Sequence, residues 1–465
     1  MPWRDALEPA RMTRVAVVTP LERVRPALVA LGGAGVVEPE ILDHAGGAAE
    51  AALQRLRARF PDVSAEPTVT LEQPDLDHLE SDHDAAALAG EMELERVRAS
   101  MISEDSVAAI AGWVPATSLG ALGEALASCG AAAVRLSPPR GVEPPTALRR
   151  APATAAFQPL VNTYGTVPYA DLNPSLLAGV AYVVMFGMMF GDVGHGALLL
   201  ALGGALAWAS HRSARWRLYR WAAPFVIGAG LTSIGFGFAY GEAFGPTGLV
   251  PTLWLRPLSH ATTLLLVAVA IGAVLLAASF TLGAINRFRE GGVARALVAL
   301  SGVAGATLYL GLAVAGAGVH WHHSVVALVG AGLVVLALAL GFLGLYAEAG
   351  GRASGTLEAG VELFDAVLRL GTNTVSFARL AAFGLTHAAL SDLVWSGTVS
   401  LWHTGGLVGV AGAVVLFALG NALTFALEAL VAGVQALRLE YYEIFSRVFS
   451  SEGREFHPWR ITVRQ

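Results

Sequence analysis

The sequence contains no lysine, only one cysteine and few charged residues of any kind. All 30 of its basic residues are therefore arginine, whose guanidinium group stays protonated in proteins. Because a phosphate-binding loop of the form GxxxxGK[ST] requires a lysine, we expect no ATP hydrolysis by this chain itself. Because Cys129 is the single cysteine of the sequence, a disulfide framework and a cysteine-based metal cluster are excluded.

Charged residues make up only 14% of the chain, against about 25% in an ordinary soluble protein, and 55% of the residues are hydrophobic. The charges gather in the first 150 or so residues. We therefore predict a cytoplasmic α/β domain at 1–150, a linker at 151–173, a transmembrane domain at 174–450 and a cytoplasmic tail at 451–465. The N-terminus lacks the apolar core of a signal peptide, and the net charge of -6 argues against a nucleic-acid partner.

The first domain contains two similar strand-helix-strand patterns, near 13–38 and near 107–137. They predict two small lobes, at 1–40 and at 102–140. Residues 41–101 between them contain two helical stretches joined by a turn rich in proline and aspartate. These residues should form a short helical hairpin.

Beyond Asn173 and Pro174, about eight apolar blocks are long enough to cross a hydrocarbon layer of about 30 Å. They lie approximately at 174–190, 195–210, 219–241, 259–285, 294–316, 322–346, 360–402 and 406–447. The last two exceed the length of a perpendicular span, so we expect them to be tilted or to extend out of the bilayer. The arginine-rich stretches all fall on one side if both termini are cytoplasmic. The predicted fold class is an α-helical membrane protein.

The seventh block carries Arg379, His387 and Asp392. An ionisable group in the middle of a span costs at least ~2.5–3.5 kcal/mol, so it usually faces a partner or a water-filled cavity. His387 either packs as a hydrogen-bonded histidine or relays protons, since its ordinary pKa of about 6.5 suits both states. Asp392 either caps a helix or reaches the outer interface.

The eighth block carries a polar stripe along an otherwise apolar helix, in which Glu428, Val431, Gln435, Arg438 and Tyr442 recur at steps of three or four residues. One interpretation is an interhelical salt bridge of Glu428 with Arg379 or Arg438 that only fixes the packing. The other interpretation is an ion path. Two arginines and a carboxylate on adjacent, overlong helices favour it, because the free energy lost when each charge leaves water must be offset.

The first apolar hairpin reads Phe186-Gly-Met-Met-Phe-Gly-Asp-Val-Gly-His-Gly196. Its glycines allow a sharp turn or a close approach of two backbones. Asp192 and His195 are spaced like a pair of metal ligands, but a tight turn between spans needs no ion. We therefore expect no metal and no cofactor.

Four stretches of this sequence resemble subunit a, also called subunit I or the 116 kDa subunit, of V-type and A-type rotary ATPases. They are Phe186–Gly196, Ser233–Phe244, Arg379–Ser391 and Glu428–Phe449. The resemblance implies a membrane stator that forms two proton half-channels against a ring of proteolipid c subunits. It also implies peripheral stalk subunits, central rotor subunits and membrane lipid as partners, and location in a prokaryotic cell membrane.

By position in these motifs, the resemblance assigns Arg379 to face the ring, Arg438 to a supporting charge and Glu428 to a half-channel. His387 matches a histidine of the family motif, and Gln435 stands where some members have histidine. Possible supporting residues are Asp192, His195, Glu242, Asp392 and Tyr442.

The front domain departs from the family pattern, because residues 41–101 can build only a short hairpin where members usually have a long coiled coil. Two alternatives stay open, and this short hairpin motivates the second of them. One is a secondary ion-coupled transporter, which should show broken helices in matching halves around a mid-membrane site. The other is a shortened family member that acts as a non-pumping scaffold.

Overall fold

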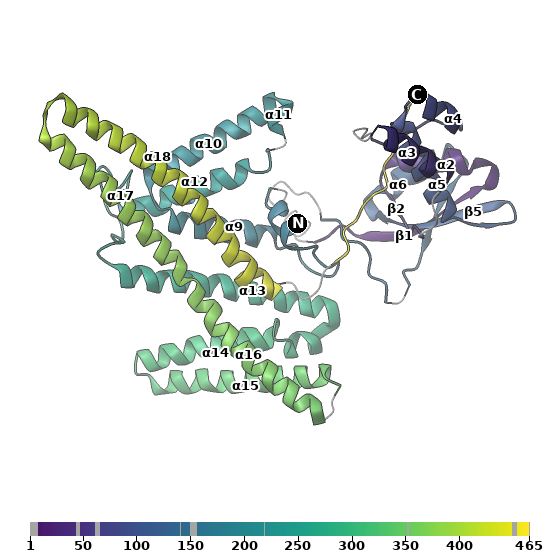
Figure 1. The fold of residues 1–465 in the computed structure, drawn as a ribbon. Helices are drawn as coiled ribbons and strands as arrows, with labels where there is room; N and C mark the ends of the chain where they lie inside the picture. Colours follow the sequence, from purple (N-terminus) through teal and green to yellow (C-terminus); the bar gives the residue numbers. More distant parts are fainter. Residues whose placement is uncertain are drawn as a thin grey trace. The chain divides into compact units, whose positions relative to one another are not determined.

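The computed structural model divides the chain into two compact units (Figure 1). It describes residues 8–42, 47–60, 66–139, 141–148, 156–217, 219–350, 353–448 and 453–464. The membrane unit comprises Met1–Glu8 and Arg150–Glu452. The front unit comprises Pro9–Arg149 and Gly453–Gln465, so both ends of the membrane unit continue into the same front unit.

The front unit is built on one antiparallel sheet with the strand order β2-β5-β1-β6, and β4 pairs with β5. The strands are β1 (Met12–Pro20), β2 (Glu38–Pro39), β4 (Ile102–Glu104), β5 (Val107–Pro115) and β6 (Ala132–Leu136). The first predicted lobe supplies β1 and the second supplies β5, and these two strands pair along their whole length. The two predicted lobes thus share one sheet, because each strand needs the other to satisfy its backbone groups.

Helices α2 (Val24–Ala34) and α6 (Leu119–Ala127) bury their apolar side chains with those of the sheet in one core. Val15 and Val17 on β1 point into this core two residues apart, as strand geometry requires. The C-terminal segment joins the same core through Trp459 and Ile461. Strand β7 (Thr462–Val463) pairs in parallel with β3 (Thr68–Val69).

The predicted helical hairpin consists of α3 (Ala48–Arg59) and α5 (Ala85–Ala99), with the short α4 (Leu76–Ser81) between them. Leu53 and Leu56 of α3 pack against Leu88 of α5 in a small core of their own. A salt bridge of 2.6 Å between Arg25 of α2 and the buried Glu91 of α5 joins the hairpin to the rest of the front unit.

The membrane unit is a bundle of helices (Figure 1). They are α8 (Gln158–Tyr164), α9 (Ser175–Met189), α10 (Val193–Arg212), α11 (Ala214–Arg217), α12 (Ala223–Tyr240), α13 (Ala261–Val298), α14 (Val303–His320), α15 (Ser324–Glu348), α16 (Ala353–Ser376), α17 (Ala378–Thr404) and α18 (Gly406–Leu439). After α18 the chain continues as a π-helix (Glu440–Phe445) and α19 (Ser446–Val448).

Six helices of the described chain are long and apolar enough to cross a membrane, and α9 is apolar but has only 15 residues. The six are α10, α12, α13, α14, α15 and the continuous segment Gly406–Val448. The predicted integral membrane protein is confirmed at this level. α17, which carries the predicted Arg379, His387 and Asp392, is not among the six.

The seventh predicted block is two helices instead of one, because the α-helical pattern breaks between α16 and α17 at Phe377. The Phe377 side chain is fully buried, and its ring lies against Gly272 of α13. From this break α17 runs beside α18 in the opposite direction, and Gly405 with a φ of 71° makes the turn between them (Figure 1). Glycine adopts this left-handed conformation without a steric penalty.

Candidate functional site

The turn between α9 and α10 lies directly against α12, because glycines leave no side chains in between. A Cβ atom on Gly194 would come within 2.4 Å of the Phe244 ring, and one on Gly237 within 2.4 Å of the backbone nitrogen of Val193. Real Cβ atoms do not approach other atoms this closely. Gly194, one of the glycines predicted to permit a sharp turn or close packing, thus permits close packing here.

Asp192 holds this turn together through three backbone amides. Its Oδ1 accepts hydrogen bonds from the amides of His195 at 2.9 Å and Phe244 at 3.0 Å, and its Oδ2 accepts one from Gly245 at 3.0 Å. The side chain is fully buried, and it caps the N-terminus of α10, where free amide groups and the helix dipole favour a negative charge.

We predict that Asp192→Ala lowers the thermal stability of the chain, because three buried amides would lose their acceptor. The expected loss is about 2–4 kcal/mol, to be measured by thermal melting in detergent with tryptophan fluorescence. Asp75→Ala is the matched control, since Asp75 caps the exposed α4 through one hydrogen bond. Equal melting temperatures for the two variants would contradict the role assigned to Asp192.

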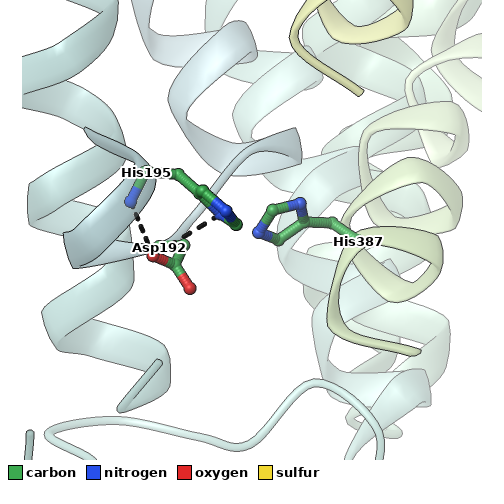
Figure 2. A group of neighbouring side chains, drawn as sticks. All are labelled: Asp192, His195 and His387. Carbon is green, nitrogen blue, oxygen red and sulfur yellow. Dashed lines mark hydrogen bonds and ion pairs between the residues drawn. The ribbon is translucent and has the colours of Figure 1, made fainter. Parts of the chain in front are cut away.

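Asp192, His195, His387 and Glu428 form a buried polar group, which we call the histidine group. Figure 2 shows His195 of α10 and His387 of α17 turned toward one another, with Asp192 beneath His195. The two rings lie 5.5 Å apart, and Nδ1 of His195 is 3.7 Å from Oδ1 of Asp192. Nδ1 of His387 makes a hydrogen bond with Oε2 of Glu428 on α18.

The histidine group has unused hydrogen-bonding capacity in a buried place. Nε2 of His387 and Oε1 of Glu428 make no hydrogen bond with a described residue. Imidazole and carboxylate groups exchange protons near neutral pH, and each can act as donor or acceptor. The arrangement can therefore accept, hold and pass on a proton.

The same residues meet the first requirement of a metal site, because one ligand atom each from Asp192, His195 and His387 lies within 4.8 Å of the others. Two imidazoles and a carboxylate are ligands that zinc accepts. The three amides on Asp192 already account for the position of its carboxylate, as the predicted tight turn requires. The absence of a metal stays a prediction.

A second polar group, which we call the arginine group, consists of Arg379, Arg438 and Glu443. Nη2 of Arg379 lies 3.2 Å from Oε1 of Glu443, and its Nε donates to the carbonyl of Ser376 at 3.0 Å. Arg438 lies on the same cavity as Arg379 and Glu443. Glu443 belongs to the π-helical turn that follows α18, a conformation that often occurs at functional positions.

The packing interpretation of the sequence paired Glu428 with Arg379 or Arg438, and the structure pairs these residues differently. Glu428 bonds to His387, and Arg379 bonds to Glu443. Sequence reasoning missed Glu443, as well as Glu440, whose carboxyl is fully buried and makes no hydrogen bond with a described residue. Two carboxylates three residues apart at the end of an apolar helix were the available signal.

The remaining predicted residues lie in different surroundings. Glu242 is buried close to the histidine group, and its carbonyl accepts a hydrogen bond from the amide of Val193 at 2.9 Å. Gln435 is half-buried on α18, between Glu428 and Arg438 along the helix. Tyr442 is 68% exposed and lines the cavity of the arginine group, whereas Asp392 is half-buried on α17.

Comparison with known proteins identifies the family of the chain. A model of the V-type ATPase 116kDa subunit family matches residues 97–256 and 360–461. These ranges include α17, α18 and every residue of the histidine and arginine groups.

Individual relatives carry related names. The A-type ATP synthase subunit I of Pyrococcus horikoshii is 27% identical over 369 residues, covering 75% of this chain and 53% of that protein. The A-type ATP synthase subunit I of Archaeoglobus fulgidus is 26% identical, covering 75% of this chain and 58% of that protein. The human V-type proton ATPase 116 kDa subunit a 3 is 34% identical over 154 residues, covering 30% of this chain and 19% of that protein. The chain spans about half the length of the archaeal relatives. Because the family model matches more than half of its residues, this chain belongs to the V-type ATPase 116kDa subunit family.

Proposed function

We propose that the chain is the membrane stator subunit of a rotary ATPase and carries protons along the α17–α18 pair to and from a ring of proteolipid subunits. The observation that carries the proposal is the position of the two polar groups at different depths of one helix pair. Arg379 and His387 are eight residues apart on α17, which corresponds to roughly 12 Å at 1.5 Å per residue. Such an offset suits two half-channels that do not meet.

Arg379 is the barrier between the half-channels in this proposal. A ring carboxylate that passes a permanent cation is held in its charged form, because a nearby opposite charge lowers the pKa of a carboxyl group. Glu443 keeps Arg379 oriented through their 3.2 Å contact. Arg438 contributes a second positive charge on the same cavity.

The histidine group, whose His387 lies eight residues beyond Arg379 on α17, belongs to one of the two half-channels. A proton that reaches Glu428 can move to His387 through their direct hydrogen bond, and from His387 toward His195. Gln435 continues the polar stripe toward Arg438. Glu242 and Asp392 are possible entry residues.

The course of the chain supports an even number of membrane crossings. Residues on both sides of the membrane unit pack into one front unit, so the chain returns to the side from which it entered. Eight crossings result if α9, α10, α12, α13, α14, α15, α17 and α18 each span the bilayer. The arginine-rich stretches favour the cytoplasm for both termini.

Purification of the tagged chain in mild detergent tests the proposal through the proteins that accompany it. We expect a proteolipid ring, peripheral stalk subunits and catalytic subunits, and ATP-driven proton transport after reconstitution of the complex into liposomes. Ion uptake by the purified chain alone would identify a secondary transporter instead. A stable assembly without ATP-linked transport would identify a scaffold.

A further inference from the structure

The connection between α10 and α12 presents six exposed side chains, three arginines and three tryptophans. They are Trp208, Arg212, Arg215, Trp216, Arg220 and Trp221, which we call the arginine-tryptophan surface. Its three tryptophans are 46–59% exposed. The sequence contains no aspartate or glutamate between Asp192 and Glu242, so no charge of opposite sign lies nearby along the chain.

The arginines of this surface also have no acidic partner from elsewhere in the fold. Other arginines of the membrane unit do have one, and Arg287, for example, bonds to Glu290 at 2.7 Å. Among the residues that the structure describes, no carboxylate lies at ion-pair distance from Arg212, Arg215 or Arg220. Because an arginine keeps its charge at any physiological pH, the surface is permanently cationic.

The surface lies at the level of one boundary of the membrane. Helix α10 has 20 residues, of which Arg212 is the last, and its length of about 30 Å equals the thickness of a hydrocarbon core. α12 packs closely beside it, since a Cβ atom on Gly203 would lie 2.9 Å from the backbone nitrogen of Ile227. Trp208 and Trp221 lie five and six residues from this contact towards the connection, so both rings are near the same end of the helix pair.

Contacts within the connection hold these side chains in a folded turn. The guanidinium carbon of Arg212 lies 4.3 Å from the centre of the Trp208 ring, a cation–π contact that leaves N–H groups available to an outside acceptor. The amide of Tyr219 donates to the carbonyl of Trp216 at 3.0 Å, and the two rings lie 6.0 Å apart. The charges and the rings therefore belong to one structured surface.

We propose that the arginine-tryptophan surface binds the headgroups of anionic phospholipids. The fork of a guanidinium group matches phosphate oxygens in pairs, and basic residues next to a membrane helix attract anionic lipids. The exposed tryptophans favour a lipid over an acidic protein, because tryptophan rings settle at the headgroup level of a bilayer. The proposal depends neither on proton transport nor on the arginine group, so it and the proposed function can fail separately.

Quenching of Trp216 fluorescence by brominated lipid tests the proposal, because it reports which lipids lie beside this residue. The full chain is reconstituted into phosphatidylcholine bilayers that contain a minor fraction of brominated phosphatidylglycerol or brominated phosphatidylcholine. The emission of Trp216 is the difference between the unmodified chain and Trp216→Phe. Each arginine near the membrane surface contributes about fivefold, so the three should enrich phosphatidylglycerol over phosphatidylcholine on the order of 100-fold.

Three double variants separate this surface from charge in general. Arg215→Gln/Arg220→Gln should lower the enrichment roughly 25-fold at an unchanged melting temperature, because both side chains are exposed. Arg215→Lys/Arg220→Lys keeps the charge and should keep most of the enrichment. Arg57→Gln/Arg59→Gln, the matched control, removes the same charge from exposed positions on α3 of the front unit and should change the enrichment less than twofold.

Two results with these lipids would overturn the proposal. One is equal quenching of Trp216 by the two brominated lipids in the unmodified chain. The other is unchanged enrichment of phosphatidylglycerol around Arg215→Gln/Arg220→Gln.

Two soluble competitors separate a lipid from other anionic ligands. Inorganic phosphate and a polyglutamate peptide, each at 100-fold excess over phosphatidylglycerol, should leave the quenching of Trp216 unchanged, because the bilayer holds headgroups at a high local concentration beside the surface. Recovery of the Trp216 emission with phosphate would make the surface a site for a soluble anion. Recovery with the peptide would make it a site for an acidic protein, and either result would overturn the lipid assignment.

Discussion

Replacing Arg379 with alanine is expected to abolish ATP-driven proton transport by the complex that contains this chain. A unit charge 4 Å from a ring carboxylate stabilises the ionised form by about 4 kcal/mol at an effective dielectric constant of 20, which corresponds to roughly a thousandfold shift in its protonation. Without this charge the ring carboxylate stays protonated as it passes, so it returns its proton to the half-channel it came from and the ring turns without net proton transport. Transport should fall at least about 100-fold, measured as acidification of proteoliposomes.

Arg256→Ala is the matched control for Arg379→Ala. Arg256 is an exposed arginine in the segment between α12 and α13, where its Nε lies 3.4 Å from the hydroxyl of Thr252. Transport by this variant should stay within twofold of the unmodified complex. Full transport by a complex with Arg379→Ala that contains all its subunits would remove Arg379 from the barrier role.

The second large effect is expected at the pair of His387 and Glu428. Positioned proton donors and acceptors typically contribute 10²–10⁴-fold to proton transfer, so His387→Ala or Glu428→Gln should each lower the transport rate about 100-fold. Because their hydrogen bond joins them into one unit, the double variant should be no worse than the poorer single variant. Transport is to be measured together with ATP hydrolysis in the same proteoliposomes.

Glu358→Gln provides the control for Glu428→Gln, since Glu358 is an exposed carboxylate on α16. It should leave the transport rate within twofold. If the two single effects instead multiply in the double variant, His387 and Glu428 act on separate steps and the proposed proton transfer between them is wrong.

Much of the membrane unit was predictable because apolar length is a local property. The blocks at 174–190, 195–210 and 322–346 match α9, α10 and α15 to within a few residues. The seventh block was wrong as a single helix, since the break at Phe377 depends on packing against α13. Hydropathy indicates how apolar a segment is, but it does not indicate where contact with a neighbouring helix interrupts the segment.

The site residues were predictable one at a time, and their pairing was not. Charge inside an apolar helix identified Arg379, His387 and Glu428. His195 and His387 are 192 residues apart in the sequence, and no local pattern indicates that their rings face each other. For the same reason, the packing interpretation of the sequence offered only an arginine as the partner of Glu428, although a histidine takes that place.

The position of Trp459 and Ile461 in the core of the front unit sets the order in which the chain can fold during synthesis. The strands and helices of this unit are made before residues 150–452 of the membrane unit, but part of their core arrives only after these roughly 300 residues. At about 5–20 residues per second, the ribosome needs roughly 15–60 s for that interval. Throughout it, the apolar surface that will receive Trp459 and Ile461 is open to chaperones and proteases. The core of the front unit is therefore completed only after the membrane unit has been made.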